Sequence, residues 1–280
     1  MLYPLFIIGV TAFFIYYLFP SDKIKNFITV HVNKTYPGIT IAVDHVTPAF
    51  PLGLRLYNVN FYHTNDPLFR MEQIKIAPGL LSLFRSKINF SFKGSAYTGM
   101  LDGKGEFTKN TPEVMIDGTL SGIRIKEISA IKDVIGRNIS GVLDGNFTYR
   151  NKKESKNNLK AQLIISNGQL ELVTPLLQLE SLAFKKITAE LAMKNMNLNI
   201  KKCIINGDQM GGSISGSVTL KNPPGQSYLK LSGTIKPHPL FLEKLGNDLP
   251  KNLLPKNIFG KNGVHIRIYG TLDTPRLFLN

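Results

Sequence analysis

The chain of 280 residues contains a single cysteine, Cys203, and lacks the residue spacings of common metal sites. One cysteine excludes an intrachain disulfide framework and therefore says little about the redox compartment. The five histidines show neither H-x-x-x-H nor H-x-H spacing, and none pairs with a neighbouring cysteine. A metal site would therefore need ligands from distant strands. We predict neither a bound metal nor a cofactor.

Signatures of catalysis are also missing. The glycine pairs Gly103-Lys-Gly105 and Gly211-Gly212 lack the spacing of a phosphate-binding loop, and no Gly-x-Ser-x-Gly elbow occurs. Asp102, Asp117 and Asp144 each neighbour a glycine at polar strand positions, where turns and solvated faces explain them better than acid–base pairing. We predict that the protein is not an enzyme, because a hydrolase on a β scaffold has no supporting motif.

What the chain does contain is a repeated alternation around glycine. Segments such as Ile116-Asp-Gly118-Thr-Leu120 and Leu231-Ser-Gly233-Thr-Ile235 place apolar residues and the glycine on one face of a strand. Because glycine weakens a strand, its repeated use there indicates bends or a close approach by another surface. The pattern predicts a mainly β fold: a long curved antiparallel sheet, shaped as a taco-like half barrel with an apolar concave face.

The alternation also assigns individual residues to the two faces of this sheet. The predicted apolar groove consists of Leu143, Phe147, Ile214, Val218, Leu231, Ile235, Ile266 and Ile268. The opposite face is predicted to carry Ser140, Asp144, Ser215, Ser217, Lys230 and Thr234. A register error of one residue would exchange the two sets. Glycines among the groove positions remove bulk that a self-filled core would use, which favours an open trough.

The N-terminus predicts a membrane anchor within residues 1–20. Leu2 to Phe19 carries no charged side chain and would span about 27 Å as a helix, and Pro20 follows it. A cleaved signal peptide is disfavoured, because no Lys or Arg precedes the apolar run and no small-x-small site follows Leu18. Lys23 and Lys25 favour a cytoplasmic C-terminal domain, although long domains often translocate regardless of such charges.

Residues 21–38 predict an amphipathic helix and a linker. Ser21 suits the N-cap, and Ile24, Phe27, Ile28 and His31 recur at helical spacing. The helix either lies along the membrane surface or plugs the near end of the sheet.

Residues 39–280 predict one continuous β domain, since no linker interrupts them. Leu52 to Leu56 and Val59 to Phe61 suggest two strand runs separated by a bulge at Tyr57-Asn58. A helix is predicted between Ile123 and Gly136, and helical or irregular structure from Pro237 to Leu254.

The formal net charge of +15 raises the question of a polyanionic partner. The lysines are scattered as pairs such as Lys152-Lys153 and Lys201-Lys202, without an aromatic-basic recognition motif, so we predict no nucleic-acid partner. Attraction to anionic lipid headgroups and protection of sheet edges by lysines both explain these residues, and both interpretations stay open.

Several segments resemble known envelope proteins. Leu54-Arg-Leu-Tyr-Asn-Val-Asn-Phe61, after the anchor, resembles the opening of AsmA-like proteins. Phe184-Lys-Lys-Ile-Thr-Ala-Glu-Leu191, Gly207 to Leu220 and the terminal Ile268-Tyr-Gly-Thr-Leu-Asp-Thr-Pro-Arg-Leu-Phe-Leu279 are similar to the type II secretion system protein N (GspN) family.

The resemblance implies a bacterial inner-membrane protein, single-pass, with its C-terminal domain in the periplasm. AsmA-like relatives imply transport of phospholipid acyl chains along an apolar groove, and the secretion family implies partners in an export machine. The leading hypothesis is an envelope transport component whose groove shelters lipid. The alternative is a structural or interaction module with a closed apolar core and no lipid cargo.

Overall fold

The computed structural model describes residues 2–35, 38–63, 66–109, 111, 113–152, 155–176, 179–239 and 263–279. Two helices, α1 (Leu2–Tyr17) and α2 (Ser21–Thr35), precede a 15-stranded sheet. The first strands are β1 (Ile39–Ala42), β2 (His45–Pro48), β3 (Leu54–His63), β4 (Asp66–Pro78), β5 (Lys87–Ala96), β6 (Gly99–Thr108), β7 (Val114–Arg124) and β8 (Ile139–Lys152). The later strands are β9 (Ser155–Leu176), β10 (Leu179–Lys194), β11 (Asn197–Gly207), β12 (Met210–Thr219), β13 (Tyr228–Pro237), β14 (Val264–Thr271) and β15 (Pro275–Leu279).

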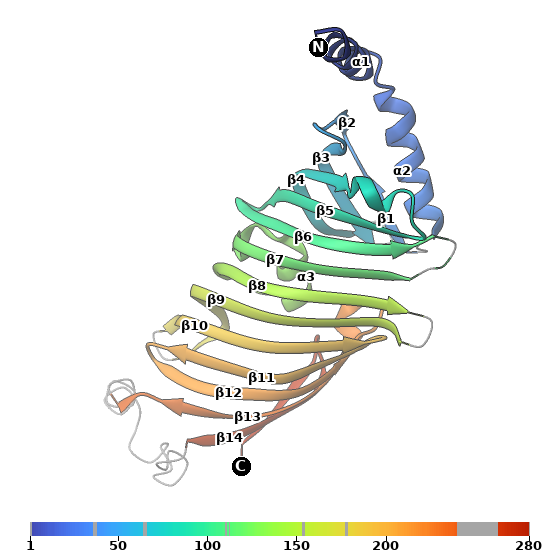
Figure 1. Cartoon of the computed structure of the whole chain (residues 1–280). Helices are drawn as coiled ribbons and strands as arrows, with labels where there is room; N and C mark the ends of the chain where they lie inside the picture. Colours follow the sequence, from blue (N-terminus) through green and yellow to red (C-terminus); the bar gives the residue numbers. More distant parts are fainter. Residues whose placement is uncertain are drawn as a thin grey trace, which may run out of the picture.

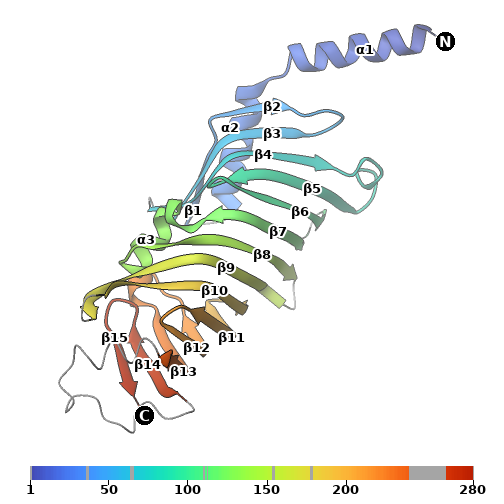
Figure 2. The same ribbon diagram turned by 90° about the vertical axis from the view of Figure 1, so that its left-hand side faces the viewer.

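The sheet has the simplest antiparallel topology. From β3 to β15 each strand pairs with the next one in the chain, so the strands form a ladder that runs the length of the molecule (Figures 1 and 2). Both β1 and β2 pair with β3, at its two ends, and together they form one interrupted edge; β15 forms the other. The prediction of a mainly β fold with one long antiparallel sheet is confirmed.

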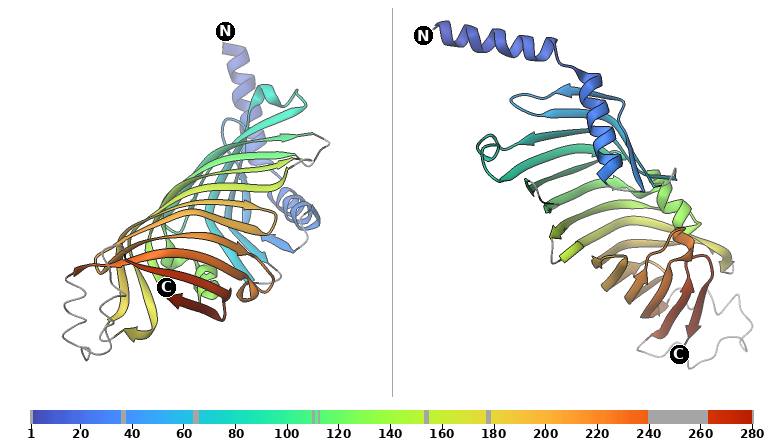
Figure 3. Two further views of the ribbon diagram at one scale, coloured as in Figure 1. Left: turned by 90° about the horizontal axis from the view of Figure 1, so that it is seen from below. Right: turned by 90° about the vertical axis from the view of Figure 1, so that its right-hand side faces the viewer.

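Bulges interrupt the alternation within several strands. In β3, Asn58 adopts a φ of 47°, and Leu56 and Val59 on either side of it both lie in the core, so the alternation is interrupted where the sequence predicted. The predicted bulge is not at Tyr57-Asn58, however, because the register against β4 shifts between Phe61 and Tyr62 instead. A second bulge lies in β7 between Leu120 and Ile123. In β11, the interval from Ile200 to Cys203 faces the shorter interval from Ile214 to Gly216 in β12. Such bulges bend strands and increase their twist, and the sheet is visibly curved (Figure 3).

Helix α2 closes one end of the apolar face. Ile24, Ile28 and Val32 pack against the buried core that includes Ile41 and Val46 of the first strands. The spacing of four residues places these three side chains along one stripe of the helix. Of the two alternatives for this segment, plugging the sheet is therefore confirmed.

The predicted apolar side of this helix was partly wrong. Phe27 is 69% exposed, and it stacks on the exposed ring of His31 at 5.6 Å between centroids instead of entering the core.

Helix α1 is shorter than the predicted membrane span. It contains 16 residues and ends at Tyr17, with the amide of Leu18 bonded to the carbonyl of Phe14 at 2.9 Å. Phe19 precedes Pro20, and the residue before a proline is disfavoured in the α conformation. Among the described residues, no helix is long and apolar enough to cross a membrane, so the fold prediction of a transmembrane helix is not supported.

The helix predicted between Ile123 and Gly136 begins later. Strand β7 runs to Arg124, a 3-10 turn covers Ile125–Glu127, and α3 spans only Ser129–Ile135 before ending at Gly136, whose φ is 68°. Ile123 therefore reaches the core from a strand, while Ile125 and Ile128 reach it from the turn that follows. Tertiary packing explains this outcome, since a strand position next to Leu143 buries Ile123 almost completely.

The last described residues form β14 and β15. Most of the predicted helical or irregular stretch from Pro237 to Leu254 lies outside the described residues.

Replacement of Ile123 by alanine tests the core at the near end of the sheet. Ile123 is 1% exposed, so we expect the free energy of unfolding to fall by about 2–5 kcal/mol, as for other buried aliphatic truncations. Urea unfolding followed by circular dichroism measures the change. The matched control is Ile204→Ala, because Ile204 is 40% exposed; an equal loss in both variants would contradict this assignment.

Candidate functional site

The paired strands define two continuous faces, which we call the apolar face and the polar face. Residues directly opposite each other in an antiparallel pair point to the same side of the sheet. One ladder of the apolar face runs from β8 to β13 through Leu143, Ile165, Ile187, Ile205, Gly212 and Ile235. A second runs from β8 to β14 through Phe147, Ala161, Leu191, Ile200, Gly216, Leu231 and Ile268.

These ladders place all eight predicted groove residues on the apolar face. Ile214 and Ile266 join it because both lie opposite Gly233, and Val218 joins it two positions beyond Gly216 in the same strand. The predicted polar set lies on the other side: Asp144, Ser140, Ser215, Ser217, Lys230 and Thr234 alternate with apolar-face neighbours in their strands. Asp102, Asp117 and Asp144 lie on the polar face as well.

The contacts of these aspartates are local. Asp144 accepts a hydrogen bond from the amide of Gly122 at 2.9 Å, within the β7 bulge, and Asp117 accepts one from the hydroxyl of Thr148 at 2.7 Å. Within the described ranges, no three His, Cys, Asp or Glu side chains are grouped so that they would hold a metal ion.

The glycines of the apolar face do not leave empty space. A Cβ added to Gly118 would lie 2.6 Å from the ring of Phe147, its partner across β7 and β8. The same cross-strand arrangement joins Phe90 with Gly105, Phe92 with Gly103, and Phe184 with Gly168. Aromatic rings that cover neighbouring glycines in this way stabilise curved sheets. At these four positions glycine makes room for an aromatic ring. The trough interpretation rested on other glycines, namely Gly141, Gly145, Gly216, Gly233 and Gly270, and stays a prediction.

Gly216 meets a backbone constraint as well. Its φ is 139°, and an added Cβ would lie 2.8 Å from the Cα of Leu231. A larger residue at this position would strain the strand and push β12 away from β13, so it would disturb the sheet rather than merely block a groove.

The near part of the apolar face is a closed core. Helix α2 and the segment around α3 pack onto strands from β1 to β8, and the cluster ends with Leu143 of β8. Among the described residues, this cluster includes none from β9 to β15. The later strands nonetheless bury several side chains on the same face, namely Phe184, Val218, Leu229, Val264 and Ile266.

An apolar cavity of about 200 Å³ lies on this later part of the face. Ile214 and Ile235 are the two predicted groove residues that line it. The other apolar side chains in its wall are Ile139, Leu170, Leu182, Phe184, Ile187, Ile205 and Met210. Ser213 and Thr234 are the polar residues of the lining, although the register places their side chains on the polar face. Such a site suits an apolar group rather than a charged one.

Cys203 belongs to the same face, between Ala189 of β10 and Ile214 of β12. Burial among these apolar neighbours raises the pKa of the Cys203 thiol above its ordinary value, because the thiolate is poorly solvated there. A thiol with a raised pKa is a poor nucleophile near neutral pH, so Cys203 acts here as a small apolar side chain.

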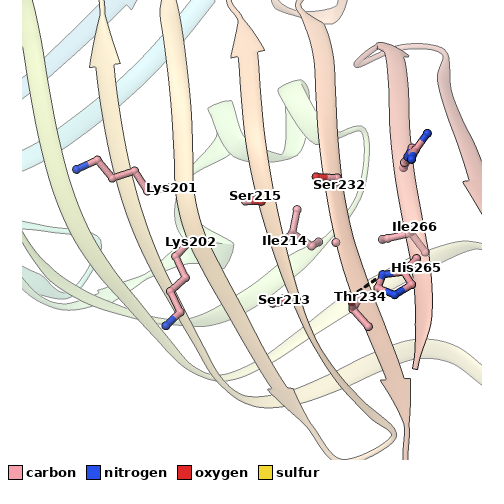
Figure 4. Close-up of a pocket in the computed structure, with 11 residues that line it drawn as sticks. Lys201, Lys202, Ser213, Ile214, Ser215, Ser232, Thr234, His265 and Ile266 are labelled. Carbon is pink, nitrogen blue, oxygen red and sulfur yellow. Dashed lines mark hydrogen bonds between the residues drawn. The ribbon is translucent and has the colours of Figure 1, made fainter. Parts of the chain in front are cut away.

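A second depression, of about 590 Å³, lies over β11 to β14 (Figure 4). On the polar face, its lining combines serine and threonine from β12 and β13 with basic side chains from β11 and β14. The sequence patterns did not identify this depression, because its residues come from four strands. A usable signal was nevertheless present: none of the strands from β11 to β15 contains an aspartate or a glutamate.

Comparison with known proteins adds no family to this description: no family model, curated protein or solved structure matches the chain.

The reactivity of Cys203 tests the environment of the apolar face. Because burial raises the thiol pKa, the thiolate forms only at higher pH than in the unfolded chain. We expect alkylation by iodoacetamide to be slower in the folded protein at pH 8 and to keep rising toward pH 10. The urea-unfolded protein is the control, and mass spectrometry measures the rates. Identical pH profiles for the folded and unfolded chains would contradict the assignment.

Proposed function

We propose that the protein is a component of bacterial envelope transport that shelters lipid acyl chains on the apolar face of its sheet. The apolar face then forms the concave side of a taco-like half barrel, as in the AsmA-like and type II secretion system protein N families that the sequence resembles. The observation that carries the proposal is the apolar cavity at Ile214 and Ile235, beyond the part of the face closed by α2 and α3.

The chemistry of the cavity supports an acyl chain over a polar ligand. A buried polar group without a partner is costly, and the wall offers almost exclusively aliphatic and aromatic side chains. An apolar cavity of about 150 Å³ already accepts a small hydrocarbon. The cavity of about 200 Å³ therefore accommodates part of an acyl chain, with the rest of the chain extending along the apolar ladder.

Attachment to the inner membrane, with the sheet in the periplasm, completes the proposal. Helix α1 extends away from the sheet (Figure 2) and exposes Tyr3, Phe6, Phe13 and Tyr17, among others. Exposed apolar and aromatic side chains of this density are typical of a surface that contacts lipid or another protein.

A closed structural module is the second candidate, and one observation favours it. The first half of the apolar face is already filled by Ile24, Ile28, Ile128 and Ile131, so it offers no room for cargo. If the later half is closed in the same manner in the cell, the protein acts as an interaction module of the export machinery without lipid.

Photo-crosslinking distinguishes these two functions. A photoreactive amino acid at Ile235 lies in the cavity, and one at the adjacent Lys236 lies on the polar face and serves as the control. We expect lipid adducts from position 235 and none from position 236 when intact cells are irradiated and the protein is analysed by mass spectrometry. Absence of adducts at both positions favours the closed module, and equal adducts at both indicate nonspecific contact with lipid.

Filling the cavity provides an independent test. Ile205→Phe adds bulk at a lining residue, whereas Ile204→Phe adds the same bulk at an exposed position of the same strand. Overpacking costs about 1–3 kcal/mol, which leaves a folded protein to compare. We expect the first variant to co-purify with several-fold less lipid than the parent and the second to be unchanged. Equal lipid content in all three proteins would rule out the cavity as the binding site.

A further inference from the structure

The depression on the polar face has a different chemistry from the cavity on the apolar face. Its floor consists of the short side chains of Ser213, Ser215, Ser232 and Thr234, which project from the adjacent strands β12 and β13. Longer basic side chains stand on either side, Lys201 and Lys202 on β11 and His265 and Arg267 on β14. Figure 4 shows the lysines on one side of the serines and His265 on the other. Short side chains between long ones explain why a sheet face is hollowed here.

The positive charge over these strands has little compensation. The strands from β11 to β15 carry no acidic residue, and across the described residues none of Lys201, Lys202 and Arg267 takes part in an ion pair. Two acidic side chains belong to neighbouring segments. Glu190 of β10 is opposite Lys202 in register but not within ion-pair distance, and Asp208 in the β11–β12 turn pairs with Lys185 at 2.9 Å.

Hydrogen-bond donors in the depression are also unused. Within the described part of the chain, the hydroxyls of Ser213, Ser215 and Ser232 have no hydrogen-bond partner. The hydroxyl of Thr234 lies 3.2 Å from Nδ1 of His265, an interaction that holds the imidazole over the depression and leaves Nε2 available. Unused hydroxyls surrounded by uncompensated cations form a site for an oxygen-rich anion.

We propose that this depression on β11–β14 binds a phosphate-type oxyanion, either free in solution or as the headgroup of an anionic lipid. The lysine and arginine side chains supply charge-assisted bonds to the anion from two sides, and the serine hydroxyls donate from the floor. The proposal is independent of lipid on the apolar face, because the two sites lie on opposite faces of the same strands. It also gives the basic residues of β11 and β14 a role beyond solubility.

Titration calorimetry of the full-length protein in detergent, with inorganic pyrophosphate at low ionic strength, tests the proposal. We expect saturable binding that K202Q/R267Q weakens by at least about tenfold, since each lost cation removes a charge-assisted contact. The control K160Q/K194Q removes the same charge from exposed positions of β9 and β10 and should retain the affinity of the parent. S232L fills the floor without changing the charge and should also abolish binding, which diffuse electrostatic attraction would not predict.

Vesicle sedimentation separates the two sources of the anion. If the anion is a lipid headgroup, the parent protein binds phosphatidylcholine vesicles more tightly when they contain phosphatidylglycerol, and both K202Q/R267Q and added pyrophosphate abolish that difference. If the anion is free, pyrophosphate binds but phosphatidylglycerol makes no difference. Absence of both effects overturns the proposal, as does an equal loss of binding in K160Q/K194Q.

Discussion

Strand register is the constraint on which the rest of this structure depends. Each strand from β4 to β14 pairs with two neighbours, so its apolar residues must match theirs over the whole ladder. A slip by one residue would move Leu231 and Ile268 to the polar face and Lys230 to the apolar face. The cost of exposing one set and burying the other would then repeat in every paired strand. This coupling keeps a long, single-layered sheet in one arrangement.

Curvature adds a second requirement to the register. The left-handed residue Asn58 in β3 and the bulges in β7 and β11 change which residues face inward, so that the apolar side continues through each bend. Glycines on this side lie under the rings of Phe90, Phe92, Phe147 and Phe184, which fill the space that a side chain would occupy. The same bends shape the polar face, where short serines between longer basic residues form a depression. One curved sheet thereby offers two chemically distinct sites on its two faces.

The two ends of the apolar face differ because helices are available only at one of them in the described structure. Ile24 and Ile28 of α2 reach the first strands directly, since the helix precedes them by a short connection. Ile128 and Ile131 reach the same core from the connection between β7 and β8. Beyond Leu143 the face relies on side chains of the sheet itself, and an apolar cavity remains among them. The asymmetry places the proposed acyl site in the later strands.

The amino-acid sequence by itself determined the strand pattern, the faces of residues such as Ile214 and Lys230, and the interruption of alternation at Asn58, because alternation and turn propensity act locally. Local patterns misjudged the start of α3, since it depends on the pairing of Ile123 with Leu143 in the neighbouring strand. Only the tertiary structure decided that Phe147 covers Gly118, that α2 closes the near end, and that basic residues of β11 and β14 flank serines of β12 and β13. These features arise from packing between strands, which periodicity along one strand does not encode.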